Sequence, residues 1–181
     1  MANFNTEVNI NPDKGMRGSQ KPRILIAKYG DGYEQRTGAG IHTEEEEWDL
    51  TWTNRTTNEG NKIIKFLEDQ GGVTAFDWYP TGYEISSTTT SANTDKLIDT
   101  SVYFTNRYLN ATVSNTTDST TATVEVVDSG TQLSLSSDIM ASGESYTIYP
   151  YKKYVCDSWS ATHPQNGVQT ITAKFRRVFE A

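Results

Sequence analysis

The clearest pattern in this chain of 181 residues is an alternation of apolar and polar positions at 48–53. Trp48, Leu50 and Trp52 alternate there with one aspartate and two threonines. Successive side chains of a strand point to opposite faces, so the alternation predicts a strand with one buried and one solvent-facing side. Weaker alternation or short apolar runs predict further strands at 33–37, 73–79, 154–159 and 168–179.

A nearly continuous apolar run from Arg23 to Tyr29 predicts a buried strand. The Gly-Asp-Gly sequence after it predicts a hairpin turn in which glycine supplies positive φ. A phosphate-binding loop would lead into a helix, and a calcium loop would need more than one carboxylate, so neither is expected. A functional role for this turn would be contact with a neighbouring subunit. The candidate assembly residues are Gly30, Asp31, Gly32, Tyr33 and Gln35.

One helix is predicted at 56–70. Thr56 and Glu59 have the spacing of a capping box, and the Gly71-Gly72 pair is a natural stop. We expect this helix to pack on the sheet that holds the strand at 48–53. Its apolar stripe, with spacing i, i+3 and i+4, is formed by Ile63, Phe66 and Leu67.

Composition divides the chain into three parts. Residues 1–22 are rich in Asn, Lys, Gly and Pro, and form a polar N-terminal arm that is either disordered or ordered on a neighbouring subunit. Residues 23–83 and 151–181 form a discontinuous β core domain. In residues 84–150, 26 of 67 positions are Ser or Thr, yet β-branched and aromatic clusters recur between turn signals, which predicts a small inserted β module.

The inserted module also accounts for nearly all of the net negative charge. The chain has a formal net charge of −7, and residues 84–150 contain eight acidic but only two basic residues. An acidic surface repels phosphates, so specific nucleic-acid binding through this module is not expected. A second acidic run precedes the strand at 48–53, and a run of this kind is most often a solvated edge. It consists of Glu44, Glu45, Glu46 and Glu47.

Residues that could carry chemistry are few. Cys156 is the only cysteine, so no internal disulfide can form, and we expect it to be a small buried residue. It and the two histidines, His42 and His163, are too few for a structural zinc site, and their spacing does not by itself make a catalytic pair. No signal peptide or membrane span is expected. Aromatic residues expected on the surface of the inserted module are Tyr103, Tyr108, Tyr146 and Tyr149.

Taken in order, several segments resemble the phage minor tail protein family. The run Gly30 to Arg36 (GDGYEQR), followed at the right distances by the other segments, is the most specific part. The resemblance covers 23–83 and 151–179. Two parts have no counterpart in it: the 67 residues between these ranges, and the N-terminal arm. The segments are Ala27–Arg36, Trp48–Thr51, Phe66–Leu67, Gly71–Gly72, Phe76–Pro80, Cys156–Trp159 and Thr172–Phe175.

The resemblance implies a mainly β, tail-tube-like sandwich or barrel core with one packed helix. It implies a non-enzymatic subunit without cofactor or metal, located in the virion tail and assembled in the host cytoplasm. It also implies a hexameric ring of identical copies between the tail tube protein and other tail-tip or baseplate proteins, through which the genome passes. In that ring the acidic run at 44–47 would face the lumen and repel DNA.

Two other functions are considered. The first is carbohydrate or receptor binding through residues 84–150, which binding of glycans by the module would indicate. The second is cell-wall hydrolysis, which would need a pair of carboxylates or a set of metal ligands. The sequence offers no convincing constellation of either kind.

Overall fold

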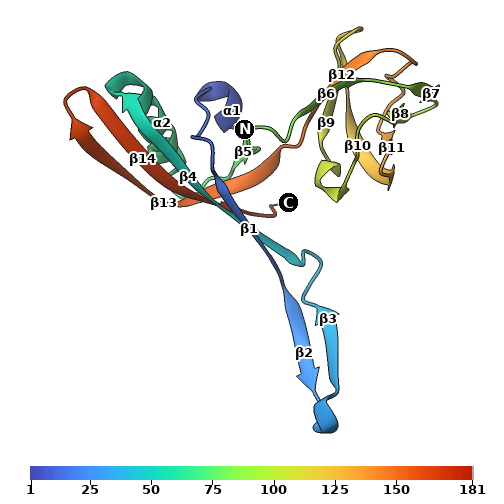
Figure 1. Ribbon diagram of the computed structural model, residues 1–181, viewed down its shortest axis with the longest axis horizontal. Helices are drawn as coiled ribbons and strands as arrows, with labels where there is room; N and C mark the ends of the chain where they lie inside the picture. The colour runs from blue at the N-terminus through green and yellow to red at the C-terminus, as the bar shows by residue number, and fades with distance from the viewer. Residues whose placement is uncertain (181) are drawn as a thin grey trace. The chain divides into compact units, whose positions relative to one another are not determined.

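Strands dominate the computed structural model, which describes residues 1–180 (Figure 1). The chain divides into a first unit, residues 1–78 with 153 to the C-terminus, and a second unit, residues 79–152. The elements of the first unit are α1 (Phe4–Glu7), β1 (Arg17–Pro22), β2 (Ile24–Lys28), η1 (Gly30–Gly32), β3 (Glu34–Gly38), β4 (Glu44–Thr56), α2 (Thr57–Gln70), β5 (Phe76–Trp78), β13 (Lys152–Gln165) and β14 (Val168–Arg177).

A five-stranded sheet with the order β1-β4-β14-β13-β5 is the framework of the first unit. The pairs β1–β4, β4–β14 and β14–β13 are all antiparallel. The predicted alternation in β4 is confirmed, since its apolar residues are buried and face buried residues of β14. These cross-strand pairs are Trp48 with Phe175, Leu50 with Ala173, and Trp52 with Ile171.

The predicted helix is confirmed as α2. The Thr56 side chain accepts a hydrogen bond from the backbone N–H of Glu59, whose carboxylate accepts one from the Thr56 backbone, so the capping box is complete. Gly71 ends the helix in the left-handed conformation with φ of 57°. The predicted apolar stripe is buried and packs on β4 and β14. The mainly β class with a packed helix is therefore confirmed, and the sandwich or barrel detail stays a prediction.

The polar N-terminal segment contributes to the core. Within residues 1–22, α1 and β1 are the regular elements. Phe4 and Val8 lie four positions apart, as on one face of a helix, and each is only 1% exposed. The Trp52 indole N–H donates to the Ile10 carbonyl at 3.1 Å. The Phe4 ring contacts those of Trp52, Phe66, Phe76 and Phe175, with centroid distances of 5.2–6.2 Å.

Strands β2 and β3 form a separate two-stranded antiparallel hairpin. The predicted turn is confirmed. Gly32 has a positive φ (81°) as expected, but the second positive φ (65°) is at Asp31 and not at Gly30. The strand predicted at 23–29 is confirmed as β2, but the prediction that it is buried is wrong, because every residue of β2 and β3 is exposed. An apolar run records a tendency toward burial, but nothing in the described chain covers these side chains.

The second unit contains a seven-stranded antiparallel sheet with the order β6-β12-β9-β10-β11-β8-β7. Its core includes Leu97, Phe104, Val113, Leu133 and Ile148. The apolar cluster at 102–104 lies outside the strands, although Phe104 is buried. The elements are β6 (Ile85–Thr88), β7 (Ser91–Asn93), β8 (Lys96–Ile98), η2 (Asn106–Tyr108), β9 (Thr112–Asn115), β10 (Thr120–Ser129), β11 (Gln132–Leu135) and β12 (Ser145–Tyr149).

Candidate assembly interface

The five-stranded sheet has two edges that strands within residues 1–180 leave largely free. β1 forms one edge and is exposed along its whole length. At the other edge β5 has three residues and β13 has fourteen, so β5 can cover only part of β13. The distal part of β13, residues 160–165, is exposed. Free edges present backbone N–H and C=O groups that can pair with another chain.

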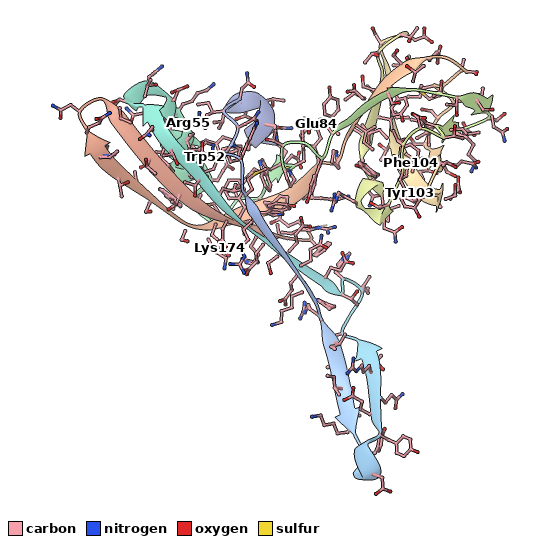
Figure 2. The ribbon with its side chains drawn as sticks, viewed as in Figure 1. Trp52, Arg55, Glu84, Tyr103, Phe104 and Lys174 are labelled. Atoms are coloured by element: carbon pink, nitrogen blue, oxygen red, sulfur yellow. The ribbon has the colours of Figure 1, made fainter. Side chains whose placement is uncertain are left out.

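The two faces of this sheet differ in chemistry. The aromatic core and the helices lie against one face, and the other face carries polar side chains that line a shallow depression. Lys174, labelled with Trp52 in Figure 2, belongs to the polar face and binds Glu47 at 2.7 Å. The depression is lined by Asp49, Leu50, Thr51, Ser158, Trp159, Ser160, Thr172, Ala173 and Lys174.

The acidic run at 44–47 divides according to the alternation of β4. Glu44 and Glu45 are exposed and Glu47 is half-buried, whereas Glu46 lies on the same face as Trp48 and is buried. Glu45 binds Arg23 at 3.3 Å between two exposed side chains. The expectation that all four glutamates share one acidic surface is therefore wrong for Glu46.

Glu46 is instead an internal acceptor. Its carboxylate accepts hydrogen bonds from the Trp48 indole N–H at 2.7 Å and from the Tyr154 hydroxyl at 2.9 Å. Arg177 lies 3.4 Å from the second oxygen. Burial raises the pKa of Tyr154, and the neighbouring Glu46 carboxylate adds to that rise, so the phenol stays protonated and can donate. Strand alternation traced back from Trp48 would have placed Glu46 inside.

The five candidate assembly residues at the hairpin turn are all exposed. The turn is closed by a hydrogen bond from the Tyr29 N–H to the Tyr33 carbonyl at 2.8 Å, and the Tyr29 hydroxyl donates to the Gln35 amide oxygen at 3.2 Å. Sequence reasoning assigned contact to this turn but missed the apolar residues on β2. Those residues are Ile24, Leu25 and Ile26, and each is exposed.

The C-terminal segment contacts the base of this hairpin. The Phe179 ring stacks on the imidazole of His42, with centroids 3.9 Å apart and planes 6° apart. The Arg177 guanidinium lies 4.6 Å from the centroid of the same ring. These contacts connect the chain just before β4 with the chain just after β14, and sequence reasoning gave no sign of them.

The four tyrosines expected on the surface of residues 84–150 have different environments. Tyr103 is 78% exposed and Tyr149 is half-buried. Tyr108 and Tyr146 are buried, so the expectation is wrong for these two. The Tyr146 hydroxyl donates to the Asp99 carboxylate at 2.8 Å, which provides the polar partner that a buried phenol needs.

Cys156 is buried, as expected, and burial raises the pKa of its thiol to about 11. A thiol with this pKa is protonated at neutral pH and is a poor nucleophile. His163, in contrast, is exposed. Across the described residues, no group of three or more His, Cys, Asp or Glu side chains is placed to hold a metal ion. None of the helices that the structure describes has the length and apolar character needed to cross a membrane.

A mainly β unit with free sheet edges and an exposed apolar hairpin has the features of an assembly protein. A family model described as phage minor tail protein matches residues 6–126, and the chain therefore belongs to this family. It is a structural component of a phage tail, as the resemblance predicted. The match includes most of the N-terminal segment and part of residues 84–150, which the predicted resemblance had left out.

The chain is similar to tail tip protein M of Escherichia phage lambda. The two sequences are 32% identical over 66 residues, which make up 36% of this chain. The matched part covers 60% of the length of tail tip protein M.

Proposed function

We propose that this protein is a ring-forming subunit of the tail tip, in which each copy joins its sheet to that of the next copy. The observation that carries the proposal is the pair of free edges on one sheet, which are β1 and the part of β13 that the short β5 leaves uncovered. Contact between two different surfaces of identical copies is heterologous, and such contacts form a ring when the rotation between copies closes after a whole number of them.

Strand direction favours this joint. Four long strands, β1, β4, β14 and β13, alternate in direction, so β1 and β13 of one copy run in opposite directions. Rotation about a ring axis keeps the direction of each strand along that axis. The β1 edge of one copy would therefore meet the β13 edge of the next in antiparallel orientation, and the hydrogen-bonding pattern of the sheet would continue.

The ring would be a hexamer that joins the tail tube protein to more distal tip or baseplate proteins, assembled in the host cytoplasm. Membership of the minor tail protein family and similarity to a tail tip protein support this position. The subunit would act through interfaces alone, without catalysis, cofactor or metal, and the genome would pass through the ring without specific binding.

In such a ring the polar face of the sheet is the one suited to the lumen, because the other face is covered by α1 and α2. Alternation along β4 places Glu45 on this polar face, where it would contribute negative potential along the path of DNA, reduced by its ion pair with Arg23. Glu44 lies on the opposite face, with Glu46, and would not contribute. Glu47 would contribute less, because Lys174 neutralises it. Neither phosphate binding nor base recognition is expected from this face.

Paired cysteines test the joint between copies. Ser19 on β1 is replaced by cysteine together with one of Ser158, Ser160 or Thr162 on β13, all of which are exposed. A disulfide needs Cα atoms within about 7 Å, so only adjacent edges can cross-link. In assembled tails we expect at least one pair to give covalent multimers of this chain, up to six copies. The control pairs Ser19→Cys with Asn58→Cys on α2, which should not cross-link.

Absence of cross-links for all three β13 positions would contradict edge pairing. The position in the tail is tested separately, by antibody labelling of virions in electron micrographs. Label at the junction of tube and tip is expected, and label along the whole tube would refute the position.

Receptor or carbohydrate binding through residues 84–150 is a second candidate, supported by Tyr103. A Cβ on Gly130 would lie 2.8 Å from Cδ2 of Tyr103, so the ring lies against a position that lacks a side chain. The remaining surface of the ring is exposed and could stack on a sugar. Glycan-array binding that is lost in Tyr103→Ala but kept in Tyr33→Ala would favour this function.

A further inference from the structure

The β2–β3 hairpin exposes several large apolar and aromatic side chains to solvent. Leu25 is 64% exposed and Tyr33 is 75% exposed, and Ile24 and Ile26 are each nearly half exposed. Side chains alternate along β2, so Leu25 lies on one face of the hairpin while Ile24 and Ile26 lie on the other. Both faces are therefore apolar along β2.

A hairpin of this kind gains little stability by itself. Isolated two-stranded hairpins are marginally stable in water, and an exposed apolar strand with a free edge is prone to uncontrolled pairing. Patches of exposed apolar residues usually mark surfaces that another molecule covers. The hairpin is therefore suited to a state in which a partner covers it.

The charges on the hairpin argue against a nucleic acid as that partner. Lys28 lies opposite Glu34 in the register, and Arg36 donates to Glu34 at 2.6 Å. With Asp31 at the turn, two basic and two acidic residues balance each other. A surface without net charge and with apolar residues on both faces fits a protein partner of similar character.

The direct connection between β1 and β2 favours a second copy of this chain as the partner. β2 follows β1 after a single residue, Arg23, whose N–H donates to the Thr43 carbonyl at 2.6 Å and whose carbonyl accepts from the Ala39 N–H at 2.9 Å. Hydrogen bonds between the two chain segments thus continue from the β1–β4 pair into the hairpin. A copy that pairs with the outer edge of β1 would meet the edge of β2 next.

We infer that the β2–β3 hairpin is an arm that packs on the next copy of this chain, with Leu25, Ile26 and Tyr33 as its contact residues. This inference rests on the proposed ring, because the ring places a second copy along β1. The arm extends each joint beyond the sheet and covers the apolar surface of β2. The joint would then consist of backbone pairing at β1 and side-chain burial at β2.

Photo-cross-linking in assembled tails tests the arm. A photoreactive amino acid replaces Leu25 in the full chain, and the control replaces Asn58 on the exposed side of α2. We expect covalent dimers and higher multimers of this chain from position 25 and none from position 58. Cross-links from position 25 to a different tail protein alone would overturn the inference.

Matched substitutions measure the contribution of the arm. Leu25→Ser with Ile26→Ser removes apolar contact, and Thr37→Ser with Asn58→Ser changes two exposed polar residues that lie outside the proposed contact. The first pair should raise the concentration for half-maximal incorporation into tails at least about tenfold, and the second pair less than about twofold. Tryptophan fluorescence should show unchanged unfolding for both pairs, because all four positions are exposed.

The two proposals fail in different ways. The proposal of the arm would be overturned, and that of the ring kept, by two results together. These are disulfide cross-links between β1 and β13, and normal incorporation into tails of the variant with Leu25→Ser and Ile26→Ser. Cross-links between copies at position 25, without any between β1 and β13, would overturn edge pairing. They would support a contact between the hairpin arm of one copy and another copy of this chain.

Discussion

The buried glutamate at the start of β4 allows a quantitative test of the structure. Glu46 is 7% exposed and accepts hydrogen bonds from Trp48 and Tyr154, with Arg177 nearby. Glu46→Ala would leave an indole N–H and a phenol O–H without their acceptor. It would also leave Arg177 without its carboxylate partner in a partly buried position.

Each buried donor that loses its acceptor costs about 1–3 kcal/mol, and removing one partner of a buried ion pair costs about 3–5 kcal/mol. The two costs overlap, and water can reach Arg177, so we expect Glu46→Ala to lower the free energy of unfolding by about 3 kcal/mol. For a domain of this size that loss corresponds to a fall in Tm of roughly 10 °C.

Neighbouring residues of the same type provide matched controls. Glu44 is exposed, and Glu45 forms only a surface ion pair with Arg23. Exposed pairs contribute about 1 kcal/mol or less, so Glu44→Ala and Glu45→Ala should change the free energy of unfolding by less than about 1 kcal/mol. Glu46→Gln keeps one oxygen acceptor and should fall between the controls and Glu46→Ala.

Urea unfolding followed by tryptophan fluorescence is a suitable assay. The chain has four tryptophans, and all of them lie in the first unit, so the signal reports that unit alone. Equal unfolding midpoints for Glu46→Ala and Glu44→Ala would refute the assignment of Glu46 as an internal acceptor, and would restore a surface role for the whole acidic run.

Three further predictions concern packing, pH and the base of the hairpin. A Cβ on Gly60 would lie 2.9 Å from Cδ of the buried Gln169. Gly60→Ala should therefore lower the free energy of unfolding by about 1 kcal/mol, although alanine favours a helix more than glycine does. Adding Gln169→Ala should reduce this loss, as measured by urea unfolding. Burial acts to raise the pKa of Asp99, but the hydrogen bonds that its carboxylate accepts, including the one from Tyr146, outweigh burial and lower the pKa. The stability that these hydrogen bonds contribute is therefore present above pH 3.8, the ordinary pKa, and is lost as the pH falls through the lowered pKa. Tyr146→Phe should therefore start acid-induced hydrogen exchange of the second unit at a higher pH than in the unchanged chain. Phe179→Ala should speed hydrogen exchange at residues 39–43 while changing tryptophan-monitored stability by less than about 1 kcal/mol, because Phe179 is largely outside the core.

Elements set by nearby residues could be predicted from the sequence. The alternation in β4 and the capping box with the apolar stripe of α2 depend on residues within about one helix or strand of each other, where backbone geometry fixes which side chains share a face. The hairpin turn at Gly30 to Gly32 was likewise predicted. In the candidate interface, the sequence identified this turn but missed the free edges, because no local pattern shows which strand lies last in a sheet.

The sequence by itself determined where strands, helix and turn form and which family the chain resembles. Only the tertiary structure decided what is covered. Glu46 is buried although it is acidic, because Tyr154, 108 residues away, comes close enough to donate to it. Leu25 is exposed although it is apolar, because no distant segment of the described chain packs over β2. Burial depends on contacts between residues far apart in sequence, and local periodicity carries no information about which distant surfaces meet.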